Sequence, residues 1–328
     1  MLDPTTLFTY ERDIDARTLR GSTLLVTLEA YTDAGHAQAL IEAHLKDALP
    51  HRLIGRLDLD QVHDYAGRRP EITLERDRFL DYAQPEILLT ELTSPSDEPF
   101  FLLSGAEPSF QWERVAAAIR IIVEQLGIER IVLVQGFPAP MPHTRPLQVT
   151  AFADDPANIR AAKGLPASFR MKASFTSMLT VRLGQAGHPT VGLVAHVPQY
   201  LAEVDYPESA IALLRAFEEE SGLTMPIGAL APSARTAREE IEAQTAEAPQ
   251  LQQLIGALED NYDRTVLEGG DGHASEAPAE EALPSSEELA AELDRFLRDL
   301  DDSPSSSPEG PAGSSDSADP EDGSGSDA

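Results

Sequence analysis

The 328-residue chain contains no cysteine. Without thiols it can form no disulfide, use no thiolate nucleophile and bind no zinc ion or iron–sulfur cluster through sulfur. We therefore exclude thiol-based redox chemistry. Tryptophan is almost absent as well, and the single Trp112 lies at the start of a predicted helix. No basic groove accompanies it, so we interpret Trp112 as a core or interface anchor rather than a base-stacking platform.

Basic residues are scarce, since 25 Lys and Arg face 56 Asp and Glu and the formal net charge is −31. Duplex nucleic acid and anionic membranes are bound through clustered Lys and Arg, so we expect neither as a partner. Long apolar runs are missing too, and none approaches the ~20 residues that a bilayer requires. The sequence begins Met1-Leu2-Asp3-Pro4 rather than with a basic and then apolar leader, and we expect a cytoplasmic protein.

Acidic residues concentrate at the C-terminal end. Residues 265–328 contain 18 Asp or Glu, with Arg295 and Arg298 as the only Lys or Arg. Beyond 267 most of the sequence is Gly, Ser, Pro, Ala and acidic residues, a composition that buries too little apolar surface to offset the entropy of ordering. We predict a folded domain over 1–267 and an acidic, mostly disordered tail over 268–328.

Within this tail, residues 285–300 (SSEELAAELDRFLRDL) predict a short amphipathic helix. Ser285 and Glu288 have capping-box spacing, and a single apolar stripe follows them. The helix either packs back on its own domain or a neighbouring subunit as a lid, or docks on another protein. The residues of the stripe are Leu289, Leu293, Phe296, Leu297 and Leu300.

Apolar, strand-like runs alternate with helical patterns through the folded part. Residues 23–30 (TLLVTLEA) are typical of a strand buried on both faces, and Asp33 is placed to cap the helix that follows. Pro108 lies where a second helix can begin. The alternation predicts a three-layer α/β/α domain with a mostly parallel or mixed central sheet, and then a helical part over about 207–264. Further strands are predicted in 51–59, 71–75, 85–92, 99–105, 131–136, 147–152 and 189–197.

The usual catalytic signatures are missing from the sequence. There is no GxxxxGK phosphate loop, no HExxH, no GxSxG elbow and no GxGxxG after a strand. The eight histidines lack the spacing of metal ligands. We expect no catalytic motif, no metal site and no cofactor.

The most unusual passage is VLVQGFPAPMPHTRPLQV, residues 132–149. Its four prolines fix φ and remove amide donors, so the segment is stiff and poorly suited to cradle a phosphate. We predict an ordered surface element at a subunit or partner interface, in which Phe137 and Met141 supply apolar contacts beside Arg145.

A ligand-binding loop is the alternative for the same passage. Arg145, next to Thr144, would clamp an anion, and His143 or His196 would transfer a proton. His196 ends a second buried strand, shortly before Tyr200, so the two histidines would share one edge of the sheet if the strands are neighbours. This arrangement would suit an enzyme of the nucleoside phosphorylase or hydrolase type.

Four motifs occur in a characteristic order: YTDAGHA, SGAEPSFQWE, QGFPAPMPHTRP and VGLVAHVPQYL. Over roughly residues 7–262 the chain resembles the proteasome assembly chaperone 2 family in its actinobacterial form. The resemblance implies an α/β fold similar to that of purine nucleoside phosphorylases, no demonstrated catalysis, and self-association, with a trimer as one candidate homo-oligomer. Some relatives act as chaperones in 20S proteasome assembly, which makes proteasome subunits the candidate partners.

One feature departs from the pattern of proteins that dock on proteasome α-rings. Those proteins often end in a hydrophobic residue, a tyrosine and any third residue, whereas this sequence ends Ser326-Asp327-Ala328. We therefore do not expect docking through the C-terminus. The main hypothesis is a non-enzymatic, protein-binding, chaperone-like factor, and the enzyme described above is its alternative.

Overall fold

The computed structural model describes residues 2–29, 33–160 and 170–268. All of these belong to one compact unit, Met1–Gly270. The predictions for the acidic tail, including the helix at 285–300, fall outside the described residues.

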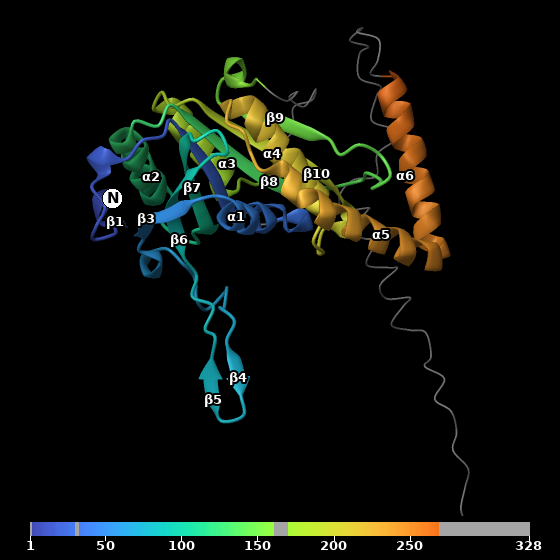
Figure 1. Cartoon of the computed structure of the whole chain (residues 1–328), viewed down its shortest axis with the longest axis horizontal. Coiled ribbons are helices and arrows are strands. Elements are labelled where there is room, and N and C mark those ends of the chain that lie inside the picture. The colour runs from blue at the N-terminus through green and yellow to red at the C-terminus, as the bar shows by residue number, and fades with distance from the viewer. Residues whose placement is uncertain (1, 30–32, 161–169, 269–328) are drawn as a thin grey trace, which may run out of the picture. The chain divides into compact units, whose positions relative to one another are not determined.

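An eight-stranded mixed sheet forms the centre of the domain, in the order β1-β3-β6-β7-β2-β8-β10-β9 (Figure 1). The four inner strands β7, β2, β8 and β10 run parallel to one another, and the remaining pairs are antiparallel. The inner strands consist of consecutive apolar residues because both of their faces are covered. The strands are β1 Phe8–Tyr10, β2 Thr23–Glu29, β3 His51–Leu57, β6 Ile87–Thr93, β7 Pro99–Ala106, β8 Arg130–Ala139, β9 Val149–Ala153 and β10 Thr190–Pro198.

Helices cover the two faces of this sheet. On one face Leu25 of β2 packs in a core with α1 (Ala37–Ala48) and α4 (Pro207–Ser221). On the other face Leu24 packs in a core with α2 (Trp112–Leu126) and α3 (Phe175–Gln185). The predicted three-layer α/β/α fold with a mixed sheet is therefore confirmed. Two further helices, α5 (Ala231–Glu247) and α6 (Pro249–Glu268), follow α4.

The sequence predicted the start of α1 correctly and placed the start of α2 a few residues too early. Asp33 accepts hydrogen bonds from the backbone N–H groups of Gln38 (2.9 Å) and Ala39 (3.2 Å), so it caps α1 as predicted. Helix α2 begins at Trp112 rather than near Pro108. The Trp112 indole N–H donates to the Pro108 carbonyl at 2.6 Å, which holds the preceding turn against the helix start.

Two predicted strands differ in extent or partner. Strand β8 continues to Ala139, because its parallel neighbour β10 continues as far and pairs Val197 with Pro138. The predicted strand at 71–75 is present in part as β4 (Thr73–Glu75). It pairs outside the main sheet with β5 (Arg78–Leu80) and forms the β4–β5 hairpin, which extends away from the sheet (Figure 1).

Candidate functional site

The proline-rich segment between β8 and β9 is bonded to α6. The Arg145 guanidinium forms two bonds with the Asp263 carboxylate, Nε to Oδ1 at 2.8 Å and Nη2 to Oδ2 at 2.6 Å. A third bond joins Arg145 Nη1 to Glu259 Oε1 at 3.1 Å, and the Thr144 hydroxyl donates to the same carboxylate. The predicted loop residues Thr144 and Arg145 therefore contact a helix of their own chain.

These bonds change the acid–base behaviour of the residues involved. The hydrogen bond from Arg145 lowers the pKa of Asp263, and the same bond raises the pKa of Arg145. Both groups are therefore charged across the physiological range. An anion could bind Arg145 only by competing with two carboxylates that are already in place.

His143 and Tyr200 form the second part of this cluster. The Tyr200 hydroxyl accepts the His143 backbone N–H at 2.8 Å and lies 2.7 Å from His143 Nδ1. A phenolic hydroxyl can both donate and accept, so it either donates to Nδ1 or accepts from it, according to the tautomer of the imidazole. Burial lowers the pKa of His143 and raises the pKa of Tyr200 to about 12. Both side chains are therefore neutral at pH 7.

The other predicted residues have separate surroundings. His196 lies on β10, beside Phe137 on the neighbouring β8, and its Nε2 is 3.0 Å from the Thr150 hydroxyl. Burial also lowers the pKa of His196. Phe137 is exposed, whereas Met141 is buried in the chain's own core.

Trp112 lies apart from this cluster, at the start of α2. Its ring packs edge-on against Phe175 of α3, with the ring centroids 5.8 Å apart. It also contacts the core between α2, α3 and the sheet. The structure therefore brings together His143, Thr144, Arg145 and Tyr200 but not Trp112.

The space between the carboxyl ends of β2 and β8 is packed by protein, at an edge where open α/β sheets usually bind ligands. Gly136 of β8 contacts the chain that follows β2, since a Cβ at this position would lie 2.1 Å from the Ala34 carbonyl oxygen. The Gln38 amide donates to the Val134 carbonyl at 2.7 Å. An apolar cluster at the same end of the sheet contains Ala34, Val197, Leu201 and Tyr206.

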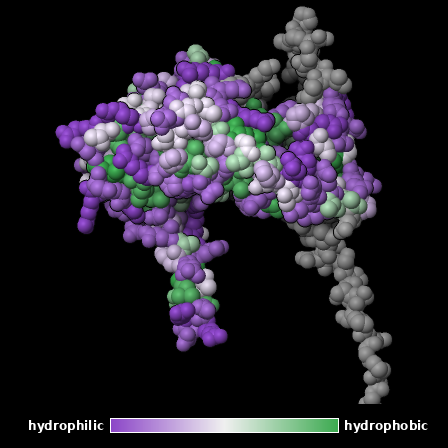
Figure 2. All heavy atoms as spheres, viewed as in Figure 1, coloured by the Kyte–Doolittle hydropathy of each residue, from purple (hydrophilic) through white to green (hydrophobic). Residues whose placement is uncertain are grey.

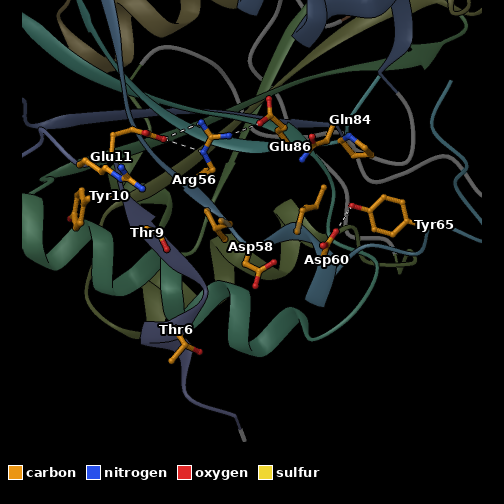
Figure 3. A pocket seen from close by; sticks show the side chains of 14 residues that line it. Thr6, Thr9, Tyr10, Glu11, Arg56, Asp58, Asp60, Tyr65, Gln84 and Glu86 are labelled. Atoms are coloured by element: carbon orange, nitrogen blue, oxygen red, sulfur yellow. Dashed lines mark hydrogen bonds and ion pairs between the residues drawn. The ribbon is translucent and has the colours of Figure 1, made fainter. Parts of the chain in front are cut away.

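Sequence patterns did not predict a cavity near the β4–β5 hairpin. This cavity, which we call the Arg56 cavity, has a volume of about 500 Å³ and lies beside β1 and the end of β3 (Figure 3). Arg56 bridges Glu11 at 3.0 Å and Glu86 at 2.9 Å across it. The lining comes from segments far apart in the sequence, so no local motif could have revealed it.

Sequence patterns predicted the β4 strand in part but missed its pairing with β5 in a hairpin. Leu74 and Phe79 are paired across the two strands, and Ile72 precedes Leu74 by two residues, so all three share one face. They are 60%, 67% and 50% exposed, respectively. Apolar atoms are visible on the hairpin in Figure 2. The opposite face carries the ion pair of Glu75 and Arg78 at 2.9 Å.

Within the described ranges no helix has the length and apolar character needed to cross a membrane. In the same ranges no group of three or more His, Asp or Glu is arranged to hold a metal ion. The candidate sites are therefore surfaces and cavities lined by ordinary polar side chains.

Comparison with known proteins identifies the family. The family model described as PAC2 family matches residues 27–245, well over half of the chain. The chain belongs to the PAC2 family. This match confirms the resemblance to proteasome assembly chaperones that the four sequence motifs predict. None of the curated proteins compared with the chain matches it.

Several solved structures align with most of the chain. Rv2714 of Mycobacterium tuberculosis, a protein of unknown function, is 33% identical, with a TM-score of 0.77 over 81% of this chain and 91% of that one. A Corynebacterium glutamicum protein of unknown function is 31% identical, with a TM-score of 0.75 over 81% and 100%. The M. tuberculosis proteasome-assembly chaperone homologue Rv2125 is 25% identical, with a TM-score of 0.65 over 71% and 99%.

Proposed function

We propose that this PAC2 protein is a non-enzymatic, protein-binding factor of the proteasome assembly chaperone type that acts on 20S proteasome subunits in the cytoplasm. The observation that carries the proposal is the alignment with the proteasome-assembly chaperone homologue Rv2125, which spans nearly the whole of that chain. The actinobacterial relatives make an actinobacterial proteasome the natural target.

The geometry of the strand ends supports binding rather than catalysis. Arg145 is held by Asp263 and Glu259, and His143 is held by Tyr200. The space between the carboxyl ends of β2 and β8 is filled by the contact of Gly136 with Ala34. These groups are arranged as structural contacts, whereas catalysis requires a reacting group with access to a substrate.

Self-association belongs to the same proposal, and the β4–β5 hairpin is the surface that supports it. An isolated two-stranded hairpin is only marginally stable in water, so its exposed apolar face needs a partner. Between residues 66 and 82 four arginines are balanced by four carboxylates, which makes the hairpin neutral in an otherwise acidic chain. Two acidic copies repel each other least through such a surface. The occupant is a second copy, in a homo-oligomer such as a trimer.

A crosslinked pulldown tests the chaperone role. The full chain is expressed in cells together with the α- and β-subunits of the 20S proteasome from the same organism, and captured proteins are identified by mass spectrometry. We expect stoichiometric recovery of proteasome subunits and faster appearance of assembled 20S particles on native gels. A bait of similar size and net charge is the control, because a chain of charge −31 also captures basic proteins non-specifically. Recovery of no proteasome subunit contradicts the proposal.

A further inference from the structure

Helix α6 covers a segment that the family model includes, although α6 itself lies outside that model. The match ends at residue 245, so it contains the proline-rich segment between β8 and β9 and stops before α6 begins at Pro249. The two are joined by the ion pairs of Arg145 with Glu259 and Asp263 (Figure 1). The segment is therefore part of the family domain, and its cover is an addition to that domain.

Helices α5 and α6 bury few of their side chains. Between residues 231 and 264, Ala234 and Ile255 are the only buried ones among the side chains that the structure describes. Leu254, next to Ile255, is 48% exposed. Regions with few buried apolar contacts open at a lower free energy than the core of a domain. We therefore expect α6 to detach while the sheet stays folded.

The connection between the two helices allows α6 to move alone. It consists of one non-helical residue, Ala248, with φ −119° and ψ 89°, and Pro249 follows it. A proline disfavours the helical conformation of the residue before it, so the chain changes direction at this point. Helix α5 is held separately, because Arg238 pairs with Glu208 of α4 at 3.2 Å.

Water reaches the polar contacts that hold α6 against the segment. The side chains of Arg145 and Glu259 are each 30% exposed, and that of Asp263 is 49% exposed. The remaining bond, from the Tyr262 hydroxyl to the Pro146 carbonyl, is 3.2 Å long. Ion pairs accessible to water contribute little to stability, because each charge is also solvated when the pair is broken. Carboxylates of another molecule can therefore replace those of α6 at low cost.

The proline-rich segment has supports other than α6. Its four prolines fix the backbone φ, and Met141 is buried in the domain. The His143 backbone N–H donates to the Tyr200 hydroxyl at 2.8 Å. Without α6 the segment would still present Arg145, whose planar guanidinium binds a carboxylate through two parallel bonds.

We propose that α6 is an autoinhibitory helix, which occupies a docking site for an acidic helix of a bound protein. Glu259, Tyr262 and Asp263 have the spacing i, i+3 and i+4, so they share one face of α6. The competing helix carries two carboxylates one turn apart and takes the places of Glu259 and Asp263 on Arg145. This inference rests on the proposed protein-binding role and adds the way in which that binding is regulated.

A fluorescent peptide of residues 249–268 tests the site, with binding measured by anisotropy. The full chain carrying Glu259→Gln and Asp263→Asn releases its own α6 from Arg145. We expect it to bind the peptide at least about fivefold more tightly than the wild type, in which the tethered helix competes. Adding Arg145→Gln to this chain should abolish binding, and a peptide with the same two substitutions should not bind. Equal affinities of the wild type and the released chain, or saturable binding to neither, overturns the inference.

The two sides of the ion pair should have opposite effects on the protein partner. In the crosslinked pulldown the Glu259→Gln, Asp263→Asn chain should recover more proteasome subunits than the wild type, and Arg145→Gln should recover fewer because it also loses the site. Glu239→Gln, Asp260→Asn makes the same charge change at exposed positions of α5 and α6 and should match the wild type.

The outcomes separate this inference from the chaperone role. A change in the same direction for both sides of the ion pair means that α6 is only structural, which contradicts autoinhibition. Peptide binding to the released chain, without recovery of proteasome subunits by any chain, supports the docking site and rejects the proteasome as its target.

Discussion

Arg145 and Asp263 are joined by two parallel hydrogen bonds, at 2.8 and 2.6 Å, although 118 residues separate them in the sequence. The pair connects the proline-rich segment to α6. Tyr262 adds a bond from its hydroxyl to the Pro146 carbonyl at 3.2 Å. These polar contacts tie α6 to a stiff segment, in addition to the apolar contact made by the buried Ile255 of the same helix.

Replacing Arg145 with Gln should loosen α6 without unfolding the sheet. We expect faster amide hydrogen exchange in 249–264 and unchanged exchange in β2 and β8. The melting temperature should fall by less than about 4 °C, because ion pairs that are only partly buried contribute little to global stability. Arg120→Gln breaks a comparable exposed pair with Glu124 within α2 and serves as the control. Unchanged exchange in α6 would mean that other contacts hold it.

His143 should make stability depend on pH on the acid side of neutrality. Burial lowers the pKa of His143 in the folded state below its ordinary value of about 6.5. The unfolded chain then binds the proton more readily, so stability falls as the pH drops below about 6.5 and continues to fall down to the folded pKa. His143→Gln should flatten the melting temperature between pH 6.5 and 5, and exposed His51→Gln should not. If the melting temperatures of the wild type and of His143→Gln fall in parallel between pH 6.5 and 5, His143 does not cause the loss of stability on the acid side.

Gly105→Ala should be strongly destabilising. Its positive φ disfavours any side chain, and the new Cβ would overlap the Glu86 carbonyl. We expect a loss of more than about 3 kcal/mol in the free energy of unfolding, measured by urea denaturation. Gly127→Ala is the matched control, since Gly127 also has a positive φ but open space around it, and it should lose only about 1–2 kcal/mol. Similar losses in the two variants would show that the contact at Glu86 relaxes.

The exposed apolar face of the β4–β5 hairpin, formed by Ile72, Leu74 and Phe79, leads to a prediction about self-association. The double variant Leu74→Asp, Phe79→Asp should lower the molecular mass measured by light scattering to that of a monomer, with little change in melting temperature. Thr73→Asp places a charge on the opposite face of the same strand and should leave the mass unchanged. A wild-type chain that is already monomeric at micromolar concentration contradicts self-association through this surface.

Sequence patterns predicted the features that depend on interactions between residues close together in the sequence. The consecutive apolar residues of β2 indicated a strand buried on both faces, and all of them from Thr23 to Leu28 are buried. Asp33 predicted the cap of α1 because capping involves neighbours a few residues away. The family motifs were recognised for the same reason, since each is a short continuous stretch.

Features assembled from distant segments could not be predicted in this way. The partners of Arg145 lie on α6, and nothing near Arg145 in the sequence identifies Glu259 or Asp263. Residues 71–75 have the composition of an ordinary strand, and their pattern does not reveal that they pair outside the main sheet. The Arg56 cavity is lined by residues of β1, the end of β3 and residues 84–86, so its volume depends on tertiary packing alone.

The placement of β2 in the sheet has a consequence for synthesis on the ribosome. Strand β2 lies between β7 and β8, so Leu24 pairs with Phe101 on one side and Ile131 on the other. One edge of this early, apolar strand therefore stays unpaired until residues up to about 106 have emerged, and the other until residues up to about 134 have emerged. A nascent chain that stops between these two points exposes the β8 edge of β2 to pairing with other nascent chains. Slow translation through the α2 region would prolong this exposure, and fast translation would shorten it.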